Sequence, residues 1–120
     1  TEGRELMAPT DSDCIFCKIV NKEIPAEIVY EDNLIVAFND IAPAAPTHIL
    51  IIPKQHFDSI HEMDDPKIAS QLFLKIPEIA EKAGLEEYRV VINRGAEAGQ
   101  TVFHLHVHII GGRTLQWPPG

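Results

Sequence analysis

The sequence predicts a single α+β domain: a five-stranded antiparallel sheet, a short helix near its N-terminus and a longer central helix. Two observations support this class. Runs of β-branched and aromatic residues follow one another along the chain, and two segments place apolar residues at helical spacing. The chain has 120 residues, 45% of them hydrophobic. That is enough to bury one core without a second domain.

Along the chain, one helix is expected before the first three strands and the other after them. Residues 14–23 carry apolar side chains at helical spacing and form the short helix. The longer helix begins at Asp65, a preferred N-cap residue that a proline follows, and it ends at Gly84. Pro77 lies inside its apolar pattern, so we expect a kink or a division there.

The five strands are expected to form a sheet with one face under the helices and the other free for chemistry. The first two form a hairpin around the turn-forming pair at 32–33, and the third is nearly all apolar and therefore central. Residues 41–46 and 95–99 are expected as loops, and 56–63 as a helical turn. The predicted strands are Ala26–Glu31, Leu34–Asn39, Thr47–Pro53, Tyr88–Asn93 and Thr101–Ile110.

Composition limits the partners. Eighteen acidic residues against ten basic ones give a net charge of −8, which repels nucleic-acid backbones and anionic membranes, so any bound phosphate must be held locally. No apolar run can span a bilayer and no signal-peptide pattern is visible, which predicts a cytoplasmic protein. Residues 1–13 are polar and without periodicity, as in a disordered leader before a domain at 14–120. Two cysteines are too few for a disulfide framework.

The segment 103–110 alternates apolar residues with histidines. Because strand side chains alternate between faces, three imidazoles are expected on one side, roughly 6.6 Å apart. The histidines are His104, His106 and His108, and the apolar set is Phe103, Leu105, Val107 and Ile109.

Three interpretations of this histidine face are possible. A solvated strand is disfavoured, because such faces usually carry Lys, Glu and Thr. A zinc site is possible, since His at i and i+2 on a strand is a common ligand pair. Nucleophilic catalysis is also possible, because a neutral imidazole can attack phosphorus. The spacing does not separate the last two.

The segment 104–110 resembles the His-φ-His-φ-His-φ-φ signature of the histidine triad (HIT) superfamily, where φ is apolar. Further segments make the chain similar to the Hint branch, the histidine triad nucleotide-binding proteins, from about residue 13 to the end. They are Pro46 to Lys54, Asn93-Arg94-Gly95, Ala98 to Thr101, and Gly111 to Arg113 with the ending Trp117-Pro118-Pro119-Gly120.

This resemblance implies an HIT-like fold and hydrolysis of purine nucleoside 5′-phosphoramidates, which yields AMP or GMP and an amine. His106 would be the nucleophile and would form a nucleotidyl-histidine intermediate. His108 and His48 would support the phosphate, with His104 completing the catalytic set. No metal is required for this chemistry.

The resemblance also implies a nucleotide site. Asp40 would accept from the ribose hydroxyls, whereas by itself an Asp there is an ordinary turn residue. The phosphate side would be formed by Asn93, Gly99, Gln100 and Thr101, and the purine would lie among Phe16, Ile19, Ile24, Phe38, Ile41 and Leu50. Two positions depart from the family pattern: Thr101 replaces the usual Ser, and Asn39 replaces the His of animal relatives.

Cys14 and Cys17 have the spacing of half a zinc site. In some HIT proteins with this pair, two histidines complete the site, and here they match His56 and His104. A structural zinc would then anchor the N-terminal helix to the sheet and leave His106 free. The alternative is two reduced thiols without metal.

Other functions remain open. A dinucleoside polyphosphate hydrolase is the alternative within the superfamily, and a non-catalytic nucleotide-binding or scaffold protein is an alternative from a different class. A zinc hydrolase with its metal on the histidine face lacks an obvious carboxylate as general base. The resemblance further implies a homodimer, in which the tail with Trp117 packs against the second subunit and approaches its site.

Overall fold

The computed structural model describes residues 13–120, and the predicted leader, apart from Asp13, lies outside them. The fold is α+β, with a five-stranded antiparallel sheet in the order β2-β3-β4-β6-β5. Among these residues no helix has the length and apolar character needed to cross a membrane. The elements are α1 Ile15–Val20, β2 Ile28–Glu31, β3 Ile35–Asn39, β4 Thr47–Pro53, η1 Ile60–Glu62, α2 Pro66–Leu74, α3 Ile76–Lys82, β5 Tyr88–Val91, η2 Ala96–Ala98 and β6 Val107–Gly111.

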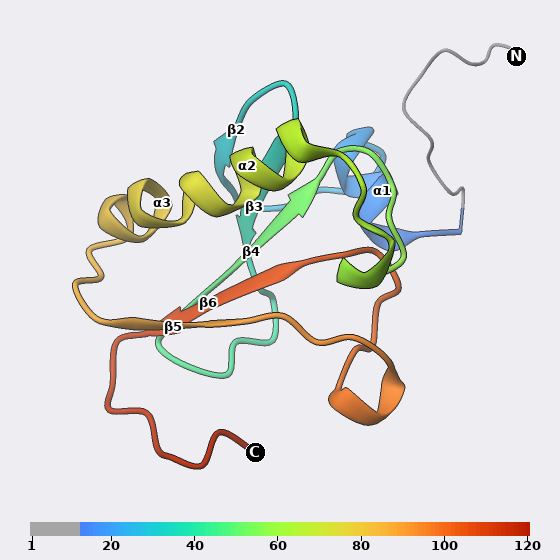
Figure 1. The fold of residues 1–120 in the computed structure, drawn as a ribbon. Coiled ribbons are helices and arrows are strands. Elements are labelled where there is room, and N and C mark those ends of the chain that lie inside the picture. The colour runs from blue at the N-terminus through green and yellow to red at the C-terminus, as the bar shows by residue number, and fades with distance from the viewer. Residues whose placement is uncertain (1–12) are drawn as a thin grey trace, which may run out of the picture.

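Helices cover both faces of the sheet. In Figure 1, α2 and α3 lie above the sheet, whereas η2 and the C-terminal tail lie below it. The alternation along β4 divides the core: Ile49 and Ile51 pack in the cluster that contains residues of α2 and α3, and Leu50 and Ile52 pack in the cluster that contains residues of α1. β4 is therefore buried on both sides, which explains its continuous apolar sequence.

The central helix is divided, as the sequence predicts. Asp65 caps α2 by accepting from the backbone N–H of Lys67 and Ile68. α2 ends at Leu74 and α3 begins at Ile76, because Pro77 has no N–H to donate and its ring opposes a continuous helix.

Three elements are shorter than predicted. α1 ends at Val20 rather than Glu23, since Lys22 adopts a left-handed φ of 63° that a helix cannot contain. β2 begins at Ile28 rather than Ala26, and β5 ends at Val91 rather than Asn93.

The last strand requires a correction, because β6 spans Val107–Gly111 and does not begin at Thr101. Its pairing with β4 ends at Ile51 and Val107. Continued pairing would place Pro53 opposite Leu105, and proline has no N–H for the ladder. The N–H of Leu105 instead donates to the carbonyl of Phe57, at 2.7 Å.

The expected alternation nevertheless survives in part beyond the strand. Leu105, Val107 and Ile109 are buried in the cluster that contains residues of α2 and α3. Phe103 does not join them and is 52% exposed, since the chain has already left the sheet at that position.

Candidate active site

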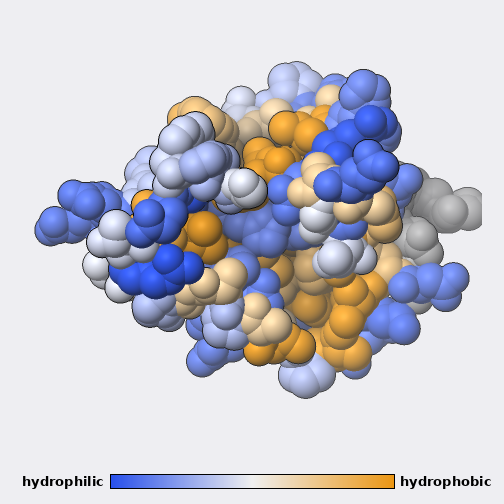
Figure 2. Space-filling view, turned by 90° about the horizontal axis from the view of Figure 1, so that it is seen from below, coloured by the Kyte–Doolittle hydropathy of each residue, from blue (hydrophilic) through white to orange (hydrophobic). Residues whose placement is uncertain are grey.

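The three histidines of 104–108 occupy different environments. His108 lies on β6, opposite Leu50 of β4 and Val91 of β5. His104 and His106 precede the strand and are 0% and 7% exposed. Figure 2 views the molecule from below the sheet, and the middle of this face is a hydrophilic recess between patches of hydrophobic side chains.

The ring of His106 is held in one tautomer. Its Nδ1 lies 2.8 Å from the backbone carbonyl oxygen of His104. Because a carbonyl only accepts, Nδ1 carries the proton and the neutral ring has its lone pair on Nε2. Among residues 13–120, His108 Nε2 is the side-chain atom that is both fully buried and unpaired. His106 Nε2 also forms no hydrogen bond with the described residues, but it is not one of the buried unpaired atoms, so it contacts solvent.

A chain of hydrogen bonds orients the other two imidazoles. The backbone N–H of Ala44 donates to His48 Nδ1 at 2.9 Å, so the proton of His48 lies on Nε2. That N–H donates to His108 Nδ1, also at 2.9 Å. The proton of His108 is then on Nε2, a buried donor without an acceptor among residues 13–120. The ring of His108 lies beside His106, with centroids 4.8 Å apart.

Both oriented rings are neutral. Burial lowers the pKa of His48, although the carboxylate of Asp40 opposes this effect. Burial, with smaller contributions from His106 and His48, lowers the pKa of His108 to about 4. The hydrogen bonds agree with neutral rings, because neither Nδ1 can be protonated while it accepts a hydrogen bond.

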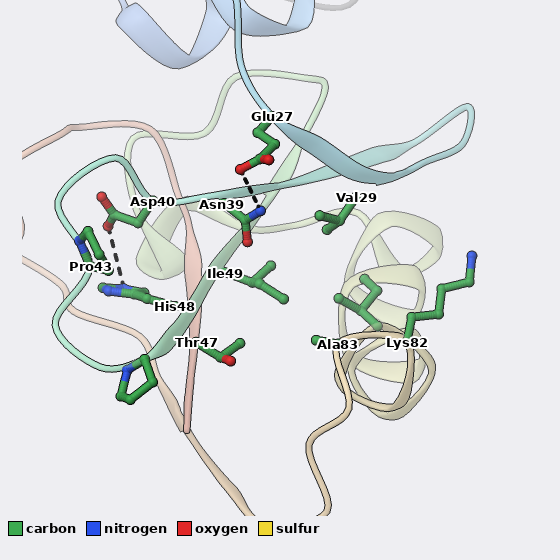
Figure 3. Close-up of a pocket in the computed structure, with 12 residues that line it drawn as sticks. Glu27, Val29, Asn39, Asp40, Pro43, Thr47, His48, Ile49, Lys82 and Ala83 are labelled. Carbon is green, nitrogen blue, oxygen red and sulfur yellow. Dashed lines mark hydrogen bonds and ion pairs between the residues drawn. The ribbon is translucent and has the colours of Figure 1, made fainter. Parts of the chain in front are cut away.

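Asp40 follows the end of β3 and points toward His48, as Figure 3 shows. Its Oδ2 lies 3.5 Å from His48 Nε2, and its Oδ1 accepts from the N–H of Ala42 at 2.9 Å. Both residues border a cavity of about 620 Å³, which extends over β4 to α3. Neither His106 nor His108 lines this cavity, so its size does not locate the chemistry.

The loop that follows β5 lies next to the histidines. Asn93 shares a smaller pocket with His48 and His108. Gly99 has a φ of 102°, and a side chain there would meet Asn93 Nδ2 at 3.4 Å. Gln100 is 2% exposed, and its amide accepts from Gly95 and donates to the carbonyls of Asp58 and Val102. The side chain of Gln100 therefore connects Gly95 and Val102 with Asp58. The next residue, Thr101, is exposed.

Five of the six residues predicted beside a purine lie together on the α1 side of the sheet. The buried members are Phe16, Ile19, Phe38 and Leu50, and Ile24 packs against them. The ring of Phe16 meets His106 edge-on at 5.1 Å. Ile41 is separate, with 98% of its surface exposed.

The predicted metal ligands also converge. Donor atoms of Cys14, Cys17, His56 and His104 all lie within 4.8 Å of one another. His104 Nδ1 lies 3.3 Å from Cys14 Sγ and 3.5 Å from Cys17 Sγ, and His56 Nδ1 lies 3.3 Å from Cys17 Sγ. The other nitrogens of the two rings are occupied: His104 Nε2 donates to the carbonyl of Pro53, and His56 Nε2 is bonded to Asp58. Both Nδ1 lone pairs thus face the sulfurs.

Comparison with known proteins identifies the family. The model of the HIT domain matches residues 21–115. The chain belongs to the HIT family. It is 53% identical to an HIT-like protein of Synechococcus elongatus over 90% of this chain and 97% of that protein. The protein HitA of Neisseria gonorrhoeae is 52% identical, over 82% and 95% of the two chains. The structure named HIT family hydrolase from Legionella pneumophila superposes with a TM-score of 0.85 at 46% identity, covering 89% of this chain and 99% of that one.

A second cluster in this HIT domain, formed by Asp40, His48 and His108, also brings possible metal ligands together. His48 Nε2 and His108 Nδ1 lie 2.9 Å apart and are joined by a hydrogen bond. Two nitrogens bound to one tetrahedral ion stand further apart, roughly 3.3 Å for bonds of about 2.0 Å. The donor set therefore fits a hydrogen-bonded relay better than a zinc site.

Sequence reasoning missed three supporting groups. The amide of Ala44 and the carbonyl of Pro53 orient His48 and His104 through backbone atoms, which leave no residue-type signal. Asp58 is different, because a carboxylate two residues after a candidate ligand histidine is a recognisable partner for it.

The protonation of His108 predicts a pH dependence of stability. The pKa of His108 in the folded chain, about 4, lies below its ordinary value of 6.5, so between these values the unfolded chain binds a proton that the folded chain excludes. The free energy of unfolding is therefore unaffected by this group above pH 6.5 and decreases progressively as the pH falls toward 4. Urea unfolding of wild type and His108→Asn at several pH values should give a shallower loss in the variant. The exposed His61→Asn serves as control, and an unchanged slope in His108→Asn would contradict the assignment.

Proposed function

We propose that this HIT domain hydrolyses purine nucleoside 5′-phosphoramidates, as the resemblance to the Hint branch implies. The observation that carries the proposal is the tautomer of His106. Its Nδ1–H is held by the carbonyl of His104, and its unprotonated Nε2 reaches solvent next to the buried N–H of His108. A nucleophile and a hydrogen-bond donor therefore stand side by side.

In the first step, the lone pair of His106 Nε2 attacks the α-phosphorus. A nitrogen–phosphorus bond to the ring forms, the bond to the departing amine breaks, and the amine nitrogen takes up one proton from solvent as it leaves. The ring becomes positively charged as the bond forms. The hydrogen bond from Nδ1–H to the His104 carbonyl stabilises that charge.

The proposed role of the N–H of His108 is to donate to a phosphoryl oxygen. It is buried and lacks a protein acceptor among residues 13–120, and an unpaired buried donor is costly unless a ligand satisfies it. A phosphoryl oxygen at this N–H would gain a hydrogen bond that strengthens as negative charge develops in the transition state.

In the second step, water attacks the phosphorus of the nucleotidyl-histidine. The bond to His106 Nε2 breaks, the ring recovers its lone pair, and the nucleoside monophosphate is released. The attacking water gives up one proton to solvent, which balances the proton that the amine takes up in the first step. One imidazole thus serves first as attacking group and then as leaving group.

The nucleoside would bind next to these histidines. Phe16 contacts both His106 and Phe38 edge-on, so a purine beside this cluster would place its phosphate near Nε2. Asp40 would accept from the ribose hydroxyls. Because both N–H groups of the Gln100 side chain already donate to the carbonyls of Asp58 and Val102, its proposed role at the phosphate is limited to its backbone.

Substitution of the nucleophile tests this function. We expect His106→Ala to lower kcat for an adenosine 5′-phosphoramidate by at least about a thousandfold, as for other nucleophiles that act within a catalytic group. His61→Ala, at an exposed site, is the matched control. A single turnover quenched with alkali, in which the histidine–phosphorus bond is stable, should trap labelled AMP on wild type and none on the variant. Retained turnover in His106→Ala would exclude the covalent mechanism, and preferential cleavage of a dinucleoside polyphosphate would assign the alternative substrate class.

We also propose that Cys14, Cys17, His56 and His104 hold a structural zinc ion. The sulfur–nitrogen distances of 3.3, 3.3 and 3.5 Å match roughly 3.5 Å, the separation of thiolate and imidazole ligands on tetrahedral zinc. Pro53 and Asp58 orient the two rings so that Nδ1 is the ligand atom. Bound zinc would neutralise two thiolates and tie α1 to the segment before β6.

Metal analysis tests this site. We expect about one zinc per chain in protein purified with zinc present, and a lower unfolding temperature after chelation. His56→Ala should reduce the zinc content strongly, whereas His61→Ala should retain it. Full-length protein that contains no zinc under these conditions would refute the site.

We further propose a homodimer. An apolar groove of about 180 Å³ runs between α2 and the sheet edge, where Val90, Ile92, Phe73 and Ile60 are exposed. β5 is the last strand of the sheet on this side, and such an edge with apolar side chains is suited to a second copy. In the single chain, Trp117 is 78% exposed and lies over Arg89, so the predicted contact of the tail with a second subunit stays a proposal.

Sedimentation equilibrium tests the dimer. We expect a dimer for the wild type and a weaker one for Val90→Asp, because a buried carboxylate without a partner opposes association. Ile41→Asp changes an isoleucine outside the groove and should remain dimeric. A monomeric wild type would exclude the proposal.

A further inference from the structure

Cys14 and Cys17 have the geometry of a pair that can form a disulfide. Cys14 is the N-cap of α1, and its Sγ accepts from the N–H of Cys17 at 3.3 Å. The two sulfurs lie within 4.8 Å of each other. A rotation of the side chains and a small movement of the first helical turn would bring them to the bonding distance of about 2.05 Å.

The two sulfurs differ in their access to solvent. Cys14 is half-buried and lines a hollow of about 280 Å³ together with Asp13, Thr101 and Phe103. Cys17 is 1% exposed. A small oxidant therefore reaches Cys14 first, and Cys17 stands behind it.

We propose that this pair is an oxidation site for hydrogen peroxide and that its oxidation weakens catalysis by His106. The Cys14 thiolate attacks one peroxide oxygen, the O–O bond breaks, and sulfenic acid and water form after one proton is taken up. The Cys17 thiolate then attacks the Cys14 sulfur, the S–O bond breaks, and a second water leaves with another proton. Two thiolates lose two electrons in total, and peroxide is reduced to two waters.

Disulfide formation would remove both thiolates from the proposed zinc ion. A disulfide is a poor metal ligand, so the two imidazoles alone would remain and the ion would dissociate. Release of the metal rests on the proposed zinc site. Formation of the disulfide itself depends only on the positions of the two sulfurs.

His104 and Phe16 connect this cluster to His106. The ring of His104 faces the sulfurs, while its backbone carbonyl holds the Nδ1–H of His106. Phe16 stands between the two cysteines in sequence, and its ring contacts those of His104 and His106 at 5.9 and 5.1 Å. His104 and Phe16 are thus positioning residues, and movement of α1 would disturb the orientation of the nucleophile.

Peroxide treatment of the zinc-loaded full chain tests the inference with three readouts. We expect intact mass to show loss of two hydrogen atoms, a chromogenic chelator to detect release of the ion, and turnover of an adenosine phosphoramidate to fall several-fold. Reductant plus zinc should restore the turnover. Blocking both thiols with iodoacetamide before oxidation should abolish the mass loss.

The variant Cys17→Ser lacks the resolving thiol and should stop at sulfenic acid, seen as addition of one oxygen and captured by dimedone. Circular dichroism reports whether this variant is folded, and the wild-type masses decide the question without it.

Oxidation of wild type to sulfinic acid with no disulfide would overturn the proposal. A disulfide with unchanged turnover would overturn the link to His106. Absence of turnover before oxidation would refute the proposed function alone, and mass and metal release would still test the pair.

Discussion

The pairing of β4 with β6 ends at Ile51 and Val107, and the arrangement of the histidines follows from that ending. Continued pairing would place Pro53 opposite Leu105, two residues before Val107, and Pro53 offers a carbonyl but no N–H. The carbonyl accepts from the Nε2–H of His104, and the Nδ1 edge of that ring is then directed toward the cysteines. The backbone of His104 is then free to accept from His106. One residue therefore contributes its side chain to one cluster and its carbonyl to another.

Backbone groups fix the protonation pattern of the site. The carbonyl of His104 makes His106 a donor at Nδ1, and the amide of Ala44 makes His48 an acceptor at Nδ1. His108 takes its tautomer from His48. A carbonyl cannot donate and an amide N–H cannot accept, so these assignments do not depend on small changes in pKa. The proposed nucleophile and the proposed donor beside it would thereby be oriented before substrate binds.

The sequence predicted features that depend on local chemistry. The apolar run of β4, the cap at Asp65 and the division of the helix near Pro77 follow from residue types alone, and the alternation in 104–110 predicted a histidine face. It did not predict that the strand begins only at Val107, because this depends on Pro53, more than fifty residues earlier in the chain. The role of Ala44 was also hidden, since any residue but proline carries the same amide.

In the proposed reaction, the electrostatics of the site would favour the transition state over the ground state. The chain carries a net charge of −8, and the rings of His48 and His108 are neutral, with pKa values lowered chiefly by burial. A bound phosphate would therefore meet oriented N–H dipoles rather than fixed cations. Positive charge would arise on His106 only as its bond to phosphorus forms, beside the carbonyl that already faces its Nδ1. An interaction that develops with the reaction lowers the barrier without tightening the binding of substrate.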